Sequence, residues 1–235
     1  GEEIFAAAEK AGVDVYYEAS VAGGIPIIKA LREGLVSNRI SRIYGIMNGT
    51  CNYILTRMEN EGADFTTVLA DAQKLGYAEA NPSLDIDGFD TAHKTAILAA
   101  LAYGRWFGLE PVHVEGIRDL ELADLRYADE LGYRIKLLAI IKSADGKVQM
   151  RVHPTLIPKN VLLANISDVF NGVMVEGDMV GQTLFYGRGA GRNATASAVT
   201  ADITDVAVNL AAGSVRRIPA FRPGEQFSEV LSMDE

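Results

Sequence analysis

The chain has 235 residues and a net charge of −9, from 22 Lys and Arg against 31 Asp and Glu. This acidic balance, with no cluster of basic residues, argues against nucleic acid or an anionic membrane surface as a partner. Hydrophobic residues make up 49% of the chain, which is enough for one sizeable core. No apolar run approaches the ~18 residues of a membrane span. The first residues also lack the basic region of a signal peptide.

Cys51 is the only cysteine, so an internal disulfide framework is excluded. This usage is typical of a reducing compartment, and we expect a cytoplasmic protein. We interpret Cys51 as a small packed residue rather than a nucleophile, because no histidine lies near it in the sequence. The three histidines share no metal-ligand spacing.

In the first half of the chain, periodicity and stop signals predict alternating helices and strands. A helix over 2–11 that ends at Gly12, followed by a strand over 13–19, resembles the end of an α/β unit. We therefore expect that part of a nucleotide-binding domain precedes this chain. The next predicted elements are a helix over 26–33, a strand over 42–47, a helix from the turn Asn48-Gly49-Thr50 to Met58, and a helix over 65–75 capped by Asp64.

The second half is richer in predicted strands. Its elements are a long apolar helix over 89–107, β-rich segments over 112–117, 133–143 and 148–156, a hairpin of 173–176 and 182–186, and a helix over 193–210. Asp145-Gly146 is a strong hairpin signal between two of the strands. Asp202 and Asp205 are expected on a solvated face of the last helix.

This order of elements predicts an α+β fold, with a mixed or antiparallel sheet covered by helices on one face. We expect a catalytic, substrate-binding domain over residues 21–186. Residues 1–20 and 187–213 would belong to a truncated Rossmann-type nucleotide-binding domain, the second as a return segment and helix. Residues 214–235, which begin with a basic, proline-containing stretch (Arg216, Arg217, Pro219, Pro223), are expected to be a linker.

The stretch from Ala72 to Lys94 carries the most chemical information. Asp90 and Lys94 stand four residues apart in a predicted helix, so they share a stripe with Ile97 and Leu101. Charged groups on a stripe that is otherwise buried are costly unless paired, and they tend to mark a functional site. The alternative is an ordinary ion pair on the surface of a helix.

This stretch resembles the signature of the homoserine dehydrogenase family. The matching residues are Ala72, Gly76-Tyr77-Ala78, Asn81-Pro82, Asp85-Ile86, Gly88, Asp90 and Lys94. Residues 18–26 and 48–53 resemble two further segments of the family, in the family's order. The resemblance covers nearly the whole chain. It implies an oxidoreductase that interconverts L-homoserine and L-aspartate 4-semialdehyde in threonine, methionine and isoleucine biosynthesis.

The resemblance also assigns site residues. Lys94 and Asp90 match the family's catalytic pair, and the matches to substrate-binding residues are Glu79, Asp85, Tyr77, Gly49 and Thr50. Alcohol oxidation by hydride transfer requires a base for the hydroxyl proton, and carboxylates are natural anchors for the ammonium of an amino acid.

The resemblance implies NAD or NADP as cofactor, with Gly191 near the nicotinamide. Without the resemblance, the glycine cluster 187–191 would be interpreted as a tight turn, because no βαβ unit follows it. The main cofactor site and a second lysine of the family would lie outside this chain, so we expect the chain alone to be inactive.

The resemblance further implies a monovalent cation, usually sodium in this family, at positions matching Glu18, Val21, Gly23 and Ile25. A loop that simply enters a helix is the alternative for this segment. We also expect a homodimer, both from the family and because the apolar strand over 133–141 would invite pairing if uncovered. Two alternatives to the function are a non-catalytic amino-acid-binding module and another small-molecule NAD(P) dehydrogenase.

Overall fold

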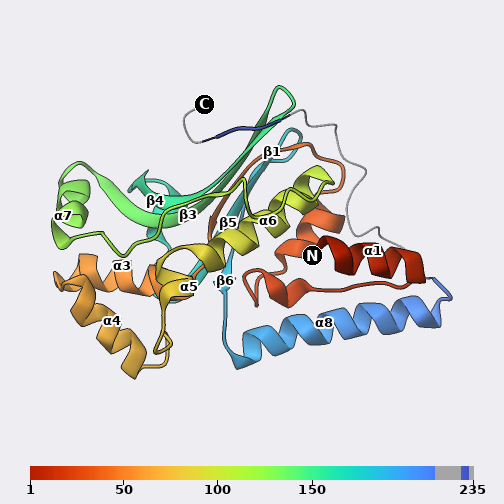
Figure 1. The fold of residues 1–235 in the computed structure, drawn as a ribbon, viewed down its shortest axis with the longest axis horizontal. Coiled ribbons are helices and arrows are strands. Elements are labelled where there is room, and N and C mark those ends of the chain that lie inside the picture. The colour runs from red at the N-terminus through yellow and green to blue at the C-terminus, as the bar shows by residue number, and fades with distance from the viewer. Residues whose placement is uncertain (215–228, 233–235) are drawn as a thin grey trace.

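The computed structural model describes residues 1–214 and 229–232, and Figure 1 shows one sheet packed against helices. Its helices are α1 (Glu2–Ala11), α2 (Ile27–Lys29), α3 (Gly49–Glu61), α4 (Phe65–Lys74), α5 (Ser83–Ile86), α6 (Phe89–Tyr103), α7 (Leu122–Glu130) and α8 (Arg192–Ala211). Its strands are β1 (Ile40–Ile46), β2 (His113–Val114), β3 (Tyr133–Ala144), β4 (Lys147–Pro158), β5 (Phe170–Gly177), β6 (Gly181–Arg188) and β7 (Glu229–Val230).

The sheet is mixed. Its strand order is β2-β4-β3-β1-β5-β6, with β7 also paired to β4. The two short strands β2 and β7 run parallel to β4, and the other pairs are antiparallel. Asp145 and Gly146 join β3 to β4 with φ angles of 51° and 74°. Two positive φ values are those of the tight turn that suits a hairpin, so the predicted Asp-Gly hairpin is confirmed.

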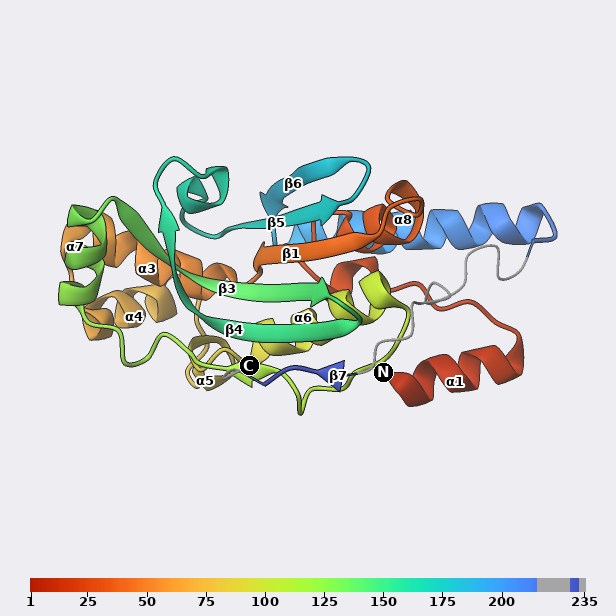
Figure 2. The same ribbon diagram turned by 90° about the horizontal axis from the view of Figure 1, so that it is seen from above.

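Side chains that alternate along the central strands divide between two cores. Ala139 and Ile141 of β3 face the larger core, which lies between the sheet and the helices. Leu138 and Ile140 face the other side, where residues of the segment 161–166 cover them. Figure 2 shows α3, α4 and α7 gathered at one end of the molecule, while α1 and α8 extend beyond the other end. The predicted mixed sheet with helical cover is therefore confirmed.

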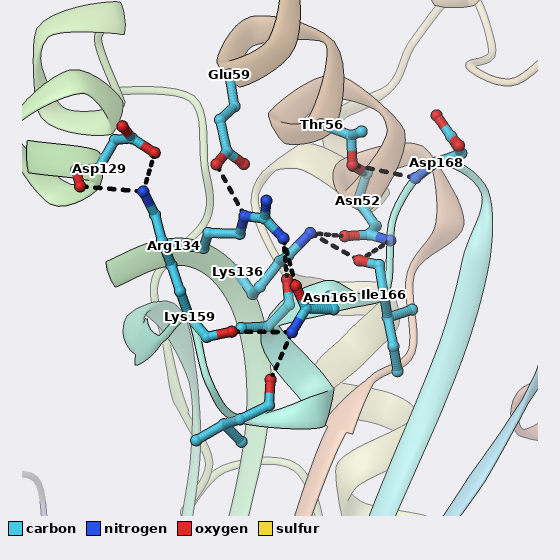
Figure 3. A network of polar contacts seen from close by, with 12 residues as sticks. Asn52, Thr56, Glu59, Asp129, Arg134, Lys136, Lys159, Asn165, Ile166 and Asp168 are labelled. Atoms are coloured by element: carbon cyan, nitrogen blue, oxygen red, sulfur yellow. Dashed lines mark hydrogen bonds and ion pairs between the residues drawn. The ribbon is translucent and has the colours of Figure 1, made fainter. Parts of the chain in front are cut away.

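A buried lysine fixes α3 to the sheet (Figure 3). Lys136 of β3 is 1% exposed, and its Nζ donates hydrogen bonds to Asn52 Oδ1 at 3.0 Å and Ile166 O at 2.7 Å. Asn52, on α3, donates to Ile166 O and Phe170 O through its Nδ2. Burial lowers the pKa of Lys136 to about 8. These bonds join a helix, a strand and a loop, so they fix the position of α3.

Several predicted elements are wrong or incomplete. The strand expected over 13–19 is absent, and Glu18–Ser20 instead form a short 3-10 helix. No strand in the described part of the chain pairs with this segment, and the Tyr17 ring contacts Phe5 and Arg32. The helix from Phe89 ends at Tyr103, because Gly104 adopts a left-handed conformation with φ 70°.

Other differences lie in the second half. The β-rich segment 112–117 contributes only the two residues of β2, and α7 was not predicted. β3 pairs with β4 on one side and β1 on the other, so it is not an uncovered strand that could pair with a second copy, as we expected of residues 133–141. The predicted linker lies largely outside the described residues, apart from Glu229–Val230, which form β7.

Candidate active site

The site is built at the junction between β1 and α3. Asn48 follows the strand in an extended conformation, and its side-chain Oδ1 accepts a hydrogen bond from Cys51 N at 2.8 Å. This is the N-cap arrangement that asparagine favours, and α3 therefore begins at Gly49. The predicted turn Asn48-Gly49-Thr50 is thus a cap and a first helical turn. A Cβ on Gly49 would lie 2.9 Å from Val169 O, so a side chain would be crowded here.

Lys94 and Asp90 form the predicted pair on α6. Lys94 Nζ lies 2.7 Å from Asp90 Oδ2 and 2.9 Å from Met47 O, at the end of β1. Their side chains are 19% and 24% exposed, so the pair lies at the margin of the core and can be reached from solvent. Within the described residues the ammonium makes no third hydrogen bond, which leaves one N–H available to a ligand.

Asn48 brings a second carboxylate into the same group. Its Nδ2 donates to Asp85 Oδ1 at 2.7 Å and to Asp90 Oδ2 at 2.9 Å. Burial raises the pKa of Asp85, the negative charge of Asp90 raises it further, and the bond from Asn48 opposes both effects. The structure therefore joins Lys94, Asp90 and Asp85, three of the residues that the sequence predicted.

Thr50, at the start of α3, and Tyr77, in the loop after α4, lie beside this group. The Thr50 hydroxyl donates to Tyr77 O at 2.6 Å, and the Tyr77 ring lies 5.0 Å from that of Tyr53. Glu79 follows two residues later with an exposed side chain. Only its main-chain oxygen has a partner among the described residues, Gln73 Nε2 at 3.0 Å. The structure thus places Glu79 on the adjoining loop without contact to Lys94.

The glycine cluster 187–191 lies at the same end of the sheet. Ile46 of β1 stands opposite Gly172 of β5, which in turn stands opposite Tyr186 of β6. With strands about 4.8 Å apart, the end of β6 lies roughly 10 Å from the end of β1. Gly191 follows with φ 109° as the N-cap of α8, and no side chain caps this helix. Its first N–H groups can therefore meet a polar or anionic ligand.

A second glycine-containing loop packs against this cluster. Gly24 N donates to Arg188 O at 3.0 Å, and a Cβ on Gly23 would lie 2.6 Å from Gly189 O. A Cβ on Gly189 would lie 1.5 Å from Asn171 Oδ1. Close approach of the two loops therefore requires glycine at these positions.

The four residues proposed for a cation have different environments. Glu18 is buried, and its carboxylate accepts hydrogen bonds from Ile28 N at 2.9 Å and Lys29 N at 2.8 Å. Ile25 O accepts one from Ile27 N. The main-chain oxygens of Val21 and Gly23 accept no hydrogen bond from any described residue. These two main-chain oxygens are of the kind that a hard cation takes as ligands.

Three other sequence interpretations can be judged from these contacts. Cys51 is fully buried and donates from Sγ to Asp85 O at 3.2 Å, which confirms it as a packed residue. Burial holds its pKa well above the usual value. Asp202 and Asp205 do not form a solvated face, because Asp202 accepts from Glu18 N and Asp205 pairs with Lys29. They dock α8 onto the segment around Glu18.

Comparison with known proteins gives the family of the chain. Residues 26–204 match a family model described as homoserine dehydrogenase. The chain belongs to the homoserine dehydrogenase family.

Two members of the family match the chain over its whole length, and a more distant one matches most of it. A homoserine dehydrogenase from Neisseria gonorrhoeae is 53% identical, with 100% of this chain and 55% of that protein aligned. The crystal structure of one from Thiobacillus denitrificans is 54% identical with a TM-score of 0.94, and covers 100% of this chain and 55% of its own. A hyperthermophilic archaeal member in complex with NADPH is 29% identical with a TM-score of 0.77, covering 88% and 60%. The chain thus spans about half the length of the first two relatives.

Two further findings concern the helices and one site residue. Every helix in residues 1–214 and 229–232 is too short or too polar to cross a bilayer. The structure also shows one site residue that the sequence reasoning missed, Asn48. The signal was an asparagine directly between a predicted strand and a helix, which is typical of a helix cap.

Proposed function

We propose that this chain is the substrate-binding and catalytic part of an NAD(P)-dependent homoserine dehydrogenase that interconverts L-homoserine and L-aspartate 4-semialdehyde. The observation that carries the proposal is the contact of the Lys94 ammonium with Asp90 and Met47 O, which leaves one N–H free beside a second carboxylate, Asp85. An amino acid with an oxygen on its side chain fits this arrangement, because its ammonium can meet carboxylates while its oxygen meets Lys94.

Lys94 is the proton carrier in this proposal. When the aldehyde is reduced, the Lys94 ammonium donates a proton to the carbonyl oxygen, and in the reverse direction the amine takes the proton from the hydroxyl. Asp90 holds the ammonium in place and balances its charge. Asp85 and Glu79 bind the ammonium of the substrate, and Tyr77, Gly49 and Thr50 border it at the start of α3.

The nicotinamide cofactor supplies or accepts the hydride when it is bound. Gly191 fits a role beside it, because the uncapped start of α8 presents main-chain N–H groups at the same end of the sheet as Lys94. The G-x-G-x-x-G sequence that binds the pyrophosphate in Rossmann domains does not occur in this chain. We propose that residues 1–20 and 187–213 dock onto a nucleotide-binding domain outside this chain, and that residues 21–186 form the catalytic domain.

The remaining features of the proposal concern the biological setting. The pathway would be the synthesis of threonine, methionine and isoleucine, in the cytoplasm. A monovalent cation, sodium in our proposal, would bind the main-chain oxygens of the loop at Val21 and Gly23. The active form would be a homodimer.

Turnover can be tested in a fusion protein, in which this chain replaces the matching segment of the Neisseria gonorrhoeae relative. Lys94→Ala should lower kcat by roughly 10²–10⁴-fold with a much smaller change in KM, because it removes the group that transfers the proton. NADPH formation coupled to L-homoserine is the measurement. Lys74→Ala is the matched control, since Lys74 forms an exposed pair with Asp71 on α4.

A Lys94→Ala variant that kept more than about half of the kcat would contradict the role of Lys94. A fusion protein that bound homoserine without forming NADPH would favour a binding module instead. Turnover of other amino alcohols in preference to homoserine would favour another dehydrogenase.

A further inference from the structure

Asn48 uses every hydrogen-bonding group of its side-chain amide that the local geometry offers. One N–H reaches Asp85, the other reaches Asp90, and the oxygen accepts from Cys51 N. Rotating the amide by 180° would point its oxygen at two carboxylates and its NH₂ at an N–H donor, so both sides would lose their bonds. The orientation of this amide is therefore fixed by its three partners. The side chain is also buried, which shields these bonds from water.

The two carboxylates contacted by Asn48 are close enough to share one nitrogen. Like charges in this arrangement disfavour the ionised form, and one of the two carboxylates would tend to hold a proton. The NH₂ group opposes this tendency, since it donates to both. Asp90 Oδ2 accepts from Asn48 at 2.9 Å and from Lys94 at 2.7 Å, so the same oxygen also sets the position of the lysine.

We propose that Asn48 is a positioning residue for the reaction, which keeps the Asp85 carboxylate ionised beside Asp90 and holds Asp90 against Lys94. This inference rests on the proposed function, in which Asp85 binds the substrate ammonium and Asp90 orients the proton carrier Lys94. Asn48 itself need not touch the reacting atoms. It acts through the residues that do.

A test must separate this role from the capping of α3. Asn48→Ser suits this purpose, because serine is also a good N-cap but carries no NH₂ to reach the carboxylates. The matched control is Asp64→Ala, which removes the N-cap of the neighbouring helix α4, where Asp64 Oδ1 accepts from Thr67 N at 2.9 Å. This control weakens a helix without contact with Asp85 or Asp90.

The first measurement follows the side-chain carboxyl ¹³C signals of Asp85 and Asp90 in this chain as the pH is changed. A hydrogen bond to a charged group contributes about 1.5–3 kcal/mol. At about 1.4 kcal/mol per unit of pKa, Asn48→Ser should raise the pKa of Asp85 by about one to two units, because the bond from Asn48 lowers it in the wild type. Asp64→Ala should leave both titrations unchanged. Unchanged titrations in Asn48→Ser would overturn the proposal.

The second measurement is the pH profile of kcat/KM for homoserine in the fusion protein. Asn48→Ser should move the acid limb upward by the same one to two pH units, so that activity recovers as the pH is raised. Equal loss of activity at every pH, with a fall in thermal stability like that of Asp64→Ala, would reduce Asn48 to a helix cap and contradict the proposal. Absence of turnover in the wild-type fusion protein would contradict the proposed function, whereas the carboxyl titrations still decide whether Asn48 holds the two carboxylates.

Discussion

The Lys94 ammonium has two acceptors, and only one of them could be predicted from the sequence. Asp90 stands one helical turn away, so the spacing alone predicts the ion pair. Met47 O is 47 positions distant, and the Asn48 amide that joins Asp85 to Asp90 acts over 37 and 42 positions. Contacts of this range depend on how β1 and α6 pack, and no local pattern records that packing.

Glu79 is the proposed site residue that lies on a loop beside the Lys94 group. Its side chain is exposed and points from a loop, so any bond it makes to a ligand must form on binding. Glu79→Gln should raise the KM for homoserine in the fusion protein by roughly 10–100-fold, because a charge-assisted hydrogen bond of about 1.5–3 kcal/mol is weakened. The kcat should change much less. Steady-state kinetics with varied homoserine are the measurement, with exposed Glu130→Gln on α7 as control.

An unchanged KM for homoserine in Glu79→Gln would remove Glu79 from the substrate site. A loss confined to kcat would instead point to a role in the chemical step.

At the scale of elements, the sequence predicted those whose signals are local. Asp64 caps α4, Gly12 ends α1, and Asp145-Gly146 joins β3 to β4 as expected. The strand expected over 13–19 failed, because β-rich composition creates a strand only where a partner strand lies beside it. α7 was not predicted, although Glu121 and Asp124 form a capping box at its start. Hydrophobic periodicity, on which the helices were predicted, does not record such a box.

The buried lysine of β3 gives the fold a dependence on pH at alkaline values. Burial lowers the pKa of Lys136 to about 8 in the folded chain; the charges of Glu59 and Asp168 oppose this effect, and that of Arg134 adds to it. Between pH 8 and roughly 10.4, the ordinary pKa of lysine, the unfolded chain binds more protons than the folded chain. The free energy of unfolding therefore rises with pH in this window, by up to roughly 3 kcal/mol.

Lys136→Met should remove this rise. Denaturant unfolding of the chain at several values from pH 7 to 10.5 would measure the difference in free energy between the wild type and the variant as a function of pH. Lys159→Met is the control, because Lys159 belongs to the same network (Figure 3) but pairs with Asp129 at the surface. A difference between wild type and Lys136→Met that did not change with pH would contradict the assignment.

At the scale of the whole molecule, one end of the sheet carries the Lys94 group and the glycine loops. α8 extends from this end, with exposed apolar side chains at Val199, Ile203, Val208 and Leu210. Apolar residues in such number on one helix are typical of a surface that meets another domain. They support the proposal that α8 docks onto a nucleotide-binding domain.

This chain alone should bind NADPH at least 100-fold more weakly than the fusion protein does. The reason is that the pyrophosphate requires a glycine-rich turn between a strand and a helix, which this sequence does not contain. Calorimetry with NADPH and with NADH on both proteins is the measurement. Micromolar affinity of this chain for either dinucleotide would show that the glycine cluster 187–191 is sufficient.

The unequal edges of the sheet limit how copies of the chain can join. β2 and β7, two residues each, occupy the outer side of the 12-residue strand β4, whereas β6 presents eight residues at the opposite edge. β6 is the edge strand whose outer side no described strand covers, so all eight of its residues can pair with another chain. Two copies joined through β6 would use both of these edges and close a two-fold dimer. Light scattering of the chain should therefore approach the mass of two copies as concentration rises and then stay constant, and a mass that kept growing would contradict this stoichiometry.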